Sequence, residues 1–342
     1  MKNDLSRLLI ELDYGEIINF NNDYFAFAAS EENFQKNNKK LIGSLITLPV
    51  LLLKHQAINI KTSEQFLKFP IIKKPKKIND LLESEELDKF IDTKKSIKLN
   101  SSEKKIISIF KKLNFLPFLV FLNKKPSGIK FQFDLNQIKK SINILDLIFK
   151  DSTSLPLEKN KNVKIFLFED LILKKTHYAL TFNQKEKIST PSVRIHSSCI
   201  TGDLMGSQKC DCGYQLETAI DYMSKNQNMG ILIYLNQEGR GLGIHNKIMS
   251  YNIQENGLDT YQADNILGFS GDERDYRSAI EILKFFKVKK LELITNNPDK
   301  IDYLKKNNIR VNKVIKIKAG INPHNLKYLR TKKLVGKHLL SL

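Results

Sequence analysis

Three cysteines stand close together near the middle of this 342-residue chain, at Cys199, Cys210 and Cys212. An odd, clustered set is a poor disulfide framework, whereas thiolates are soft ligands that suit zinc. The fourth ligand would be a histidine such as His196 in a structural site, or water in a catalytic one. Zinc lowers the pKa of bound water towards ~7 and so supplies a nucleophile at neutral pH. The spacing alone leaves open a catalytic site, a structural site and reduced cysteines without metal.

A glycine-rich segment, Asn236 to Gly243 (NQEGRGLG), follows an expected buried strand and precedes an expected helix. Its glycines would let the backbone approach an anion, and the free N–H groups at a helix N-terminus suit phosphate. The segment matches neither the dinucleotide-binding fingerprint nor the P-loop. A turn that simply requires glycine is therefore the alternative to a phosphate site.

Two further loops carry polar and charged residues. GDERDY at 271–276 places acids and the fixed cation of Arg274 near the start of a helix. Capping explains the acids, but a guanidinium would suit a phosphate. TNNP at 295–298 follows a strand and precedes Lys300, where ordinary helix-boundary chemistry competes with a binding role.

Strands alternate with amphipathic helices along the second half of the chain. Stretches 164–168, 178–182, 193–196, 230–235 and 291–295 have strand composition, and 212–226 has one apolar helical face. Another helix is expected from Arg274 or Asp275 to Val288. This alternation predicts an α/β (α+β) domain over residues 151–342, with a mixed sheet flanked by helices. Residues 1–150 are expected to form a smaller α/β domain, with a linker at 151–162.

The formal charge of +19 invites a nucleic-acid reading, but basic residues are not concentrated in either half. Residues 1–150 hold 26 basic and 17 acidic side chains, and residues 151–342 hold 30 and 20. We therefore interpret the excess as a solvated lysine surface that could attract a polyanionic small molecule.

The longest apolar run, 41–53, is too short for a membrane span. Charged residues interrupt the apolar stretch that a secretory signal would need at the N-terminus. A cytoplasmic location is therefore expected.

Taken together, the motifs closely resemble GTP cyclohydrolase II. The matching segments are RIHSSCITGDLMGSQKCDCGYQLETAI, YLNQEGRGLGIHNKI, YNIQENGLDTYQADNILGF, DERDY, LITNNPDKI and NPHNLKYLRTKKLVGKHLL. The resemblance implies a hydrolase acting on the cyclic amidine C–N bond of GTP in the first step of riboflavin biosynthesis. The implied products are formate, diphosphate and 2,5-diamino-6-ribosylamino-4(3H)-pyrimidinone 5′-phosphate. It also implies one Zn²⁺ per subunit, Mg²⁺ with the triphosphate, and a homodimer.

The resemblance assigns roles residue by residue. Cys199, Cys210 and Cys212 would bind zinc. Asp272 matches the proposed proton acceptor, Arg274 the proposed nucleophile, and Tyr251 a tyrosine near the opened ring. Because guanidinium stays protonated in proteins, Arg274 can instead be a stabiliser of phosphoryl charge. The implied GTP contacts are Arg194, Ile195, His196, Ser197, Ser198, Gln215, Glu238, Gly239, Arg240, Thr260, Thr295 and Lys300.

The sequence departs from the family at Ser198, where glutamate is usual, and at Asp264, where asparagine is commoner. The N-terminal segment LSRLLIELDYGEIINFNNDYFAFAASEE resembles the opening of 3,4-dihydroxy-2-butanone 4-phosphate synthase. It lacks that enzyme's acidic Mg²⁺-binding cluster and has only the isolated Asp23. The N-terminal domain is therefore expected to be a degenerate, non-catalytic synthase-like domain.

Two alternatives to the enzyme reading remain. Ser198 and Asp264 motivate an inactive homologue that binds zinc and nucleotide. The net charge motivates a zinc-stabilised nucleic-acid-binding protein, whose binding would persist at physiological salt without competition from GTP.

Overall fold

The computed structural model describes residues 2–82, 87–129, 131–184, 190–336 and 339. The chain divides into two compact units. The N-terminal unit comprises residues 1–144 and 245–273, and the cysteine unit comprises residues 145–244 and 274–342. Within the described residues, the helices are too short or too polar to cross a membrane.

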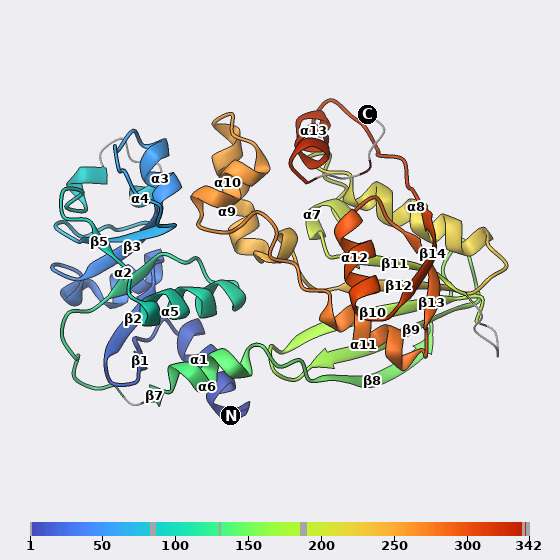
Figure 1. Cartoon of the computed structure of the whole chain (residues 1–342), viewed down its shortest axis with the longest axis horizontal. Coiled ribbons are helices and arrows are strands. Elements are labelled where there is room, and N and C mark those ends of the chain that lie inside the picture. The colour runs from blue at the N-terminus through green and yellow to red at the C-terminus, as the bar shows by residue number, and fades with distance from the viewer. Residues whose placement is uncertain (1, 83–86, 130, 185–189, 337–338, 340–342) are drawn as a thin grey trace. The chain divides into compact units, whose positions relative to one another are not determined.

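The N-terminal unit is built on a seven-stranded sheet in the order β5-β4-β3-β6-β2-β1-β7 (Figure 1). Neighbouring strands pair antiparallel, except for the parallel pair β1 and β7. The strands are β1 (Ile18–Phe20), β2 (Tyr24–Ala28), β3 (Leu45–Pro49), β4 (Phe66–Pro70), β5 (Ile97–Lys98), β6 (Leu119–Phe121) and β7 (Gln132–Phe133). The helices are α1 (Lys2–Asp13), α2 (Glu31–Lys36), α3 (Val50–His55), α4 (Asn79–Leu82), α5 (Ser101–Lys112), α6 (Leu135–Ser141), α9 (Ile244–Glu255) and α10 (Thr260–Ile266), with 3-10 turns η1 (Asn38–Lys40) and η2 (Leu87–Lys89).

Helices α9 and α10 come from the middle of the chain, yet most of this segment packs with the N-terminal unit. α10 contacts α3, and the Asn246 side chain donates a hydrogen bond to the carbonyl oxygen of Asn114. Gly268 has a φ of +84°, and a Cβ there would lie 2.7 Å from the Phe66 ring. The close approach therefore requires glycine at this position.

The cysteine unit contains a second seven-stranded sheet, in the order β14-β13-β11-β12-β10-β9-β8. β8, β9, β10 and β12 pair antiparallel, whereas β12, β11, β13 and β14 pair parallel. The strands are β8 (Leu147–Ser154), β9 (Val163–Asp170), β10 (Lys175–Phe182), β11 (Ser192–Ser197), β12 (Gly230–Leu235), β13 (Lys290–Ile294) and β14 (Arg310–Ile315). The helices are α7 (Ile200–Asp203), α8 (Cys212–Lys225), α11 (Arg277–Phe285), α12 (Pro298–Lys306) and α13 (Leu326–Leu334), with the 3-10 turn η3 (Gly239–Gly241).

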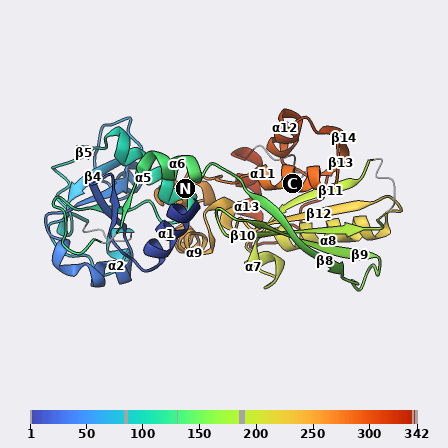
Figure 2. The ribbon, with the colours of Figure 1, turned by 90° about the horizontal axis from the view of Figure 1, so that it is seen from below.

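Alternating apolar residues of the parallel strands bury both faces of this sheet, as expected where helices cover each side. Ile231 and Ile233 pack with Leu283 of α11 and Leu304 of α12. Leu232, between them on β12, packs on the other face with residues of α8. Figures 1 and 2 show α8 opposite α11 and α12 across the sheet. The predicted α/β class, with a mixed sheet flanked by helices, is confirmed.

Local patterns located most elements of the cysteine unit. The predicted strand 230–235 is β12, and the predicted helix 212–226 is α8, which ends one residue earlier. The linker expected at residues 151–162 is wrong for its first four residues, which lie in β8 and pair with β9. The exposed side chains of β8 explain the error, since its polar residues resemble a loop. The helix expected from residue 274 or 275 begins at Arg277.

Candidate metal and nucleotide site

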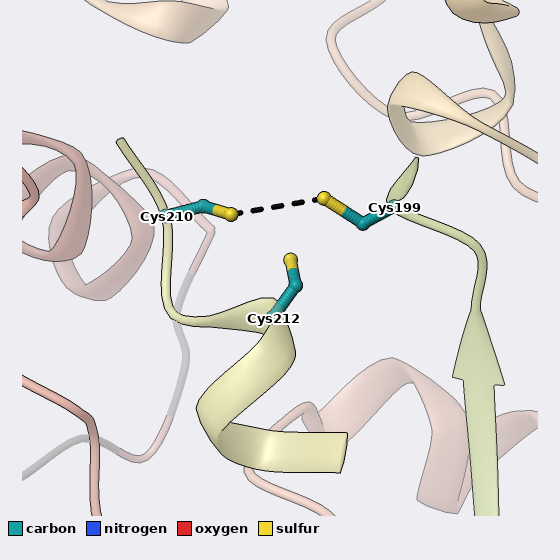
Figure 3. Close-up of side chains that lie close together, drawn as sticks. All are labelled: Cys199, Cys210 and Cys212. Carbon is teal, nitrogen blue, oxygen red and sulfur yellow. Dashed lines mark hydrogen bonds between the residues drawn. The ribbon is translucent and has the colours of Figure 1, made fainter. Parts of the chain in front are cut away.

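The three cysteines converge at the end of strand β11 (Figure 3). Cys199 is the N-cap of α7, and Cys212 begins α8 directly after Cys210 and Asp211. The Sγ atoms of Cys199 and Cys210 are 3.7 Å apart, and all three Sγ atoms lie within 4.8 Å of one another. Two thiolates bound at ~2.3 Å in a tetrahedral site would lie about 3.8 Å apart. The geometry therefore fits one zinc ion.

The structure places none of the three cysteines in a disulfide, and Cys210 and Cys212 favour their protonated form when no cation is bound. The hydrogen bond with Cys199 raises the pKa of Cys210 to about 12, and burial adds to the shift. The pKa of Cys212 is raised by hydrogen bonds with both other cysteines. A divalent cation would stabilise the thiolates and displace these protons, as in other cysteine metal sites.

Gly202 of α7 makes the close packing around the thiols possible. A Cβ at this position would lie 2.8 Å from the Cys210 Sγ and 3.1 Å from the Cys199 Sγ. These separations are shorter than van der Waals contact allows. Any side chain at Gly202 would therefore push the cysteines apart.

Asp203 fixes the strand end from which Cys199 comes. Its carboxylate accepts hydrogen bonds from the Cys199 backbone N–H (2.9 Å) and the Tyr234 hydroxyl (2.9 Å). The Nε2 of His196 lies 3.0 Å from the same carboxylate, and its ring stacks on Tyr234. Burial lowers the pKa of His196. The cluster of potential ligand atoms holds the three cysteines without His196, so the structure does not support His196 as a fourth protein ligand.

The glycine-rich segment is hydrogen-bonded to the same strand end. The Glu238 carboxylate accepts from the Ile200 backbone N–H at 2.6 Å. The Ser198 hydroxyl accepts from the Gln237 backbone N–H, and the Ser197 hydroxyl accepts from the Gln237 side chain. At Arg240, φ is +57°, which lies in the left-handed region. The structure therefore brings Ser197, Ser198 and the Glu238–Arg240 segment together beside the cysteines.

Other residues expected to contact GTP lie deeper. Arg194 is 4% exposed and donates to the Gln215 side chain (2.6 Å) and the Ile294 carbonyl oxygen (3.1 Å). Burial lowers its pKa. Lys300 donates to the Ile195 carbonyl oxygen at 2.7 Å. The Ile195 side chain is in the core, so any polar contact it made with a substrate would come from its backbone.

The loops after β12 and β13 add further polar groups. Thr295 is buried, and its hydroxyl accepts from the Asn297 backbone N–H at 3.0 Å. The Asp275 backbone N–H donates to the Gln237 side-chain oxygen at 2.9 Å, which ties the segment after Arg274 to the glycine-rich segment. The Arg274 guanidinium lies 5.8 Å from the centre of the Tyr276 ring.

Three of the residues that the resemblance implicates, Tyr251, Thr260 and Asp272, belong to the N-terminal unit. The Tyr251 ring lies 5.7 Å from the Lys247 ammonium group, and the Thr260 hydroxyl donates to the Gln254 side chain. Asp264, one of the two departures from the family, is buried and accepts from the Ser250 hydroxyl at 2.7 Å. The substitution at 264 therefore has a hydrogen-bond partner.

Sequence reasoning did not assign roles to Asp203, Asp211, Tyr234 or Lys332. The positions of Asp203 and Asp211 in the sequence could have indicated a role. Asp203 follows Cys199 by four residues, and Asp211 lies between Cys210 and Cys212. Tyr234 and Lys332 reach the site only through the fold. Lys332 lies 3.0 Å from the Asp211 carboxylate, although the two are 121 residues apart in the chain.

Comparison with known proteins identifies the family. A family model described as GTP cyclohydrolase II matches residues 149–316. The GTP cyclohydrolase-2 of Aliivibrio fischeri MJ11 is 41% identical over 196 residues, which cover 57% of this chain and 94% of that protein. The GTP cyclohydrolase-2 of Psychromonas ingrahamii is 45% identical over 190 residues, covering 55% and 94%. A riboflavin biosynthesis protein of Vibrio vulnificus is 41% identical over 184 residues, covering 54% of this chain and 50% of that protein. The chain therefore belongs to the GTP cyclohydrolase II family of hydrolases.

Proposed function

We propose that the chain is a zinc-dependent GTP cyclohydrolase II that binds one Zn²⁺ per subunit through Cys199, Cys210 and Cys212. The observation that carries this proposal is the convergence of three cysteine Sγ atoms at separations suited to a tetrahedral ion. With three protein ligands, a fourth position would be left for water, as in catalytic zinc sites. When bound, zinc would supply the activated water that hydrolysis at C8 of the purine requires.

The proposed reaction converts GTP and water into formate, diphosphate and 2,5-diamino-6-ribosylamino-4(3H)-pyrimidinone 5′-phosphate. Hydrolysis opens the five-membered ring and releases C8 as formate. Cleavage of the bond between the α- and β-phosphates releases diphosphate. Both steps are hydrolytic, so neither requires an oxidant or reductant. This chemistry would be the first step of riboflavin biosynthesis.

Side chains of the cysteine unit would bind GTP and stabilise the negative charge of its phosphates. Glu238, Gly239 and Arg240 would contact GTP, and their segment is held against Ile200 by the Glu238 carboxylate. Arg274 would stabilise negative charge on the phosphoryl groups, since its guanidinium keeps its proton. Mg²⁺ bound with the triphosphate would neutralise further charge and assist the departure of diphosphate.

Residues below the surface would position these groups. Arg194 and Gln215 form a hydrogen-bonded pair under the cysteines, and Lys300 is fixed to the carbonyl oxygen of Ile195. The remaining assignments follow the family. Asp272 would accept a proton, Tyr251 would lie near the opened ring, and Thr260, Thr295 and the Ile195–Ser198 segment would contact GTP.

The inactive-homologue alternative is not favoured by the surroundings of the two departures. The Ser198 hydroxyl holds the glycine-rich segment through the Gln237 backbone, and Asp264 is hydrogen-bonded to Ser250. Neither residue belongs to the cysteine cluster itself. Both positions therefore have local hydrogen-bond partners in this chain.

Three expectations about the whole protein also belong to the proposal. We expect a homodimer that works in the cytoplasm, with GTP and not nucleic acid or membrane as its partner. We expect the domain formed by residues 1–150 to lack synthase activity, since its opening segment has only the isolated Asp23. Formation of dihydroxybutanone phosphate from ribulose 5-phosphate by the purified protein would contradict the last expectation.

One assay tests the central proposal. Purified protein is incubated with GTP, Zn²⁺ and Mg²⁺, and formate and the pyrimidine product are followed together. Equal amounts of both products, lost after zinc removal and recovered after zinc is restored, would support it. Zinc binding without formate release would favour the inactive homologue, and undiminished turnover in a metal-free preparation would reject zinc dependence.

A further inference from the structure

Helix α13 (Leu326–Leu334) follows the region matched by the family model, which ends at residue 316, and lies in the C-terminal segment NPHNLKYLRTKKLVGKHLL. It carries a charged side chain to the cysteine site. The Lys332 ammonium group lies 3.0 Å and 3.4 Å from the two carboxylate oxygens of Asp211. The Lys332 side chain is 10% exposed and the Asp211 side chain 0%. Asp211 is the residue between Cys210 and Cys212.

Two more contacts fasten this part of the chain to the site. The fully buried Asn325, which is the N-cap of α13, donates from its side-chain amide to the carbonyl oxygens of Gly320 (2.6 Å) and Cys210 (3.4 Å). The Tyr328 ring lies 5.6 Å from the Arg240 guanidinium and 5.5 Å from the Lys332 ammonium group. One short helix therefore contacts both the cysteine turn and the glycine-rich segment.

The Lys332–Asp211 pair continues into a buried network. Asp211 also accepts a hydrogen bond from the Gln215 side chain, and Gln215 accepts one from Arg194. Both oxygens of the Asp211 carboxylate are thus engaged. The turn that carries two of the three thiols is held by side chains from β11, α8 and α13.

The positive charges of this network oppose the negative charge of the proposed metal centre. Three thiolates around one divalent ion carry a net charge of −1, Asp211 adds another −1, and the Asp203 carboxylate at the Cys199 backbone adds a third. Lys332 and Arg194 supply two positive charges against them. Removing Lys332 would leave an uncompensated carboxylate next to an already negative centre, and a buried unpaired charge is strongly unfavourable.

We propose that Lys332 is a positioning residue, which acts through Asp211 to hold the Cys210–Cys212 turn and to balance the charge of the metal centre. This inference rests on the proposed zinc site. A pair that served stability alone would not need to lie between two metal ligands, and apolar residues of similar volume often stabilise a core equally well. Residues that hold metal ligands in position without binding the metal themselves commonly change the metal affinity when they are mutated.

The test compares Lys332→Met with Lys333→Met, which removes an exposed lysine from the neighbouring position of the same helix. Zinc affinity is measured by competition with a chromophoric chelator, and thiolate-to-cobalt absorption is recorded after replacement with Co²⁺. We expect Lys332→Met to weaken zinc binding by about 10 to 100-fold and to alter the cobalt spectrum. Lys333→Met should match the wild type in both measurements.

Two variants separate positioning from simple loss of folding. Lys332→Arg keeps the charge and should recover most of the affinity. Asp211→Asn combined with Lys332→Met removes both charges, and it should bind zinc more tightly than Lys332→Met alone. If Lys332→Met does not fold, Lys332→Gln is measured in its place.

The outcomes distinguish the two proposals. A wild-type protein that binds no zinc would reject the metal centre itself. If the wild type binds zinc and either Lys332→Met or its glutamine replacement keeps wild-type affinity and cobalt spectrum, the role of Lys332 is overturned. It is also overturned if the double variant is no better than the single one.

Discussion

Among the residues that the structure describes, each unit contains a lysine–carboxylate pair in which both side chains are no more than 10% exposed, but the two pairs have different surroundings. In the N-terminal unit, Lys68 lies 2.6 Å from Glu103, which also completes the capping box at the start of α5. In the cysteine unit, Lys332 pairs with Asp211 between two potential metal ligands. The first pair closes a helix end, whereas the second continues through Gln215 to Arg194. Burial of a charge pair therefore does not identify a functional site, but the groups that surround it do.

The largest effect is expected from Cys210→Ser, which removes one of the three soft ligands. A hydroxyl binds zinc far more weakly than a thiolate, so the variant should lose its metal, and formate release from GTP should fall below detection. Zinc content and formate are measured on the same preparation. A Cys210→Ser protein that contains no zinc and still releases formate at the normal rate would remove the proposed mechanism.

The matched change in the other unit is Lys68→Met. It leaves the Glu103 carboxylate buried without its cation and should lower the free energy of unfolding by about 3–5 kcal/mol. Urea unfolding followed by circular dichroism measures this loss. Zinc content should stay at the wild-type level, in contrast to the expected behaviour of Lys332→Met. Loss of zinc from Lys68→Met at a temperature where the variant is folded would show that the Lys68–Glu103 pair also affects zinc binding, contrary to this prediction.

A smaller effect on catalysis is expected from Arg240→Ala. Its guanidinium belongs to the glycine-rich segment beside the cysteines, where we propose that it contacts GTP. Loss of one charge-assisted hydrogen bond, worth about 1.5–3 kcal/mol, should weaken GTP binding by roughly 10 to 100-fold. Steady-state kinetics should show the change mainly in KM, with zinc content unaffected. A loss confined to kcat would instead assign Arg240 to the chemical step.

The sequence predicted the parts of the site that are local. The spacing of the three cysteines suggested that their thiols could share one ion, and the structure brings their Sγ atoms together. Apolar periodicity located β12 and α8. Long-range contacts could not be predicted in this way. Nothing near Lys332 in the sequence indicates Asp211, and nothing around Gly268 indicates the close approach of Phe66. The exposed strand β8 was missed because its solvent-facing residues have loop-like composition.

The smallest effect is expected from Asn100→Ala, which changes the capping box at the start of α5 in the N-terminal unit. The Asn100 side chain accepts from the Glu103 backbone N–H at 2.9 Å, and the Glu103 carboxylate accepts from the Asn100 backbone N–H at 2.8 Å. Asn100→Ala removes the first of these bonds and should lower the free energy of unfolding by about 1 kcal/mol. Asn100→Asp keeps an accepting oxygen and should lose less. Neither variant should change zinc content or formate release, because the Lys68–Glu103 pair stabilises a helix end and not the metal centre. A change in zinc affinity in Asn100→Ala would mean that the two buried pairs are energetically coupled.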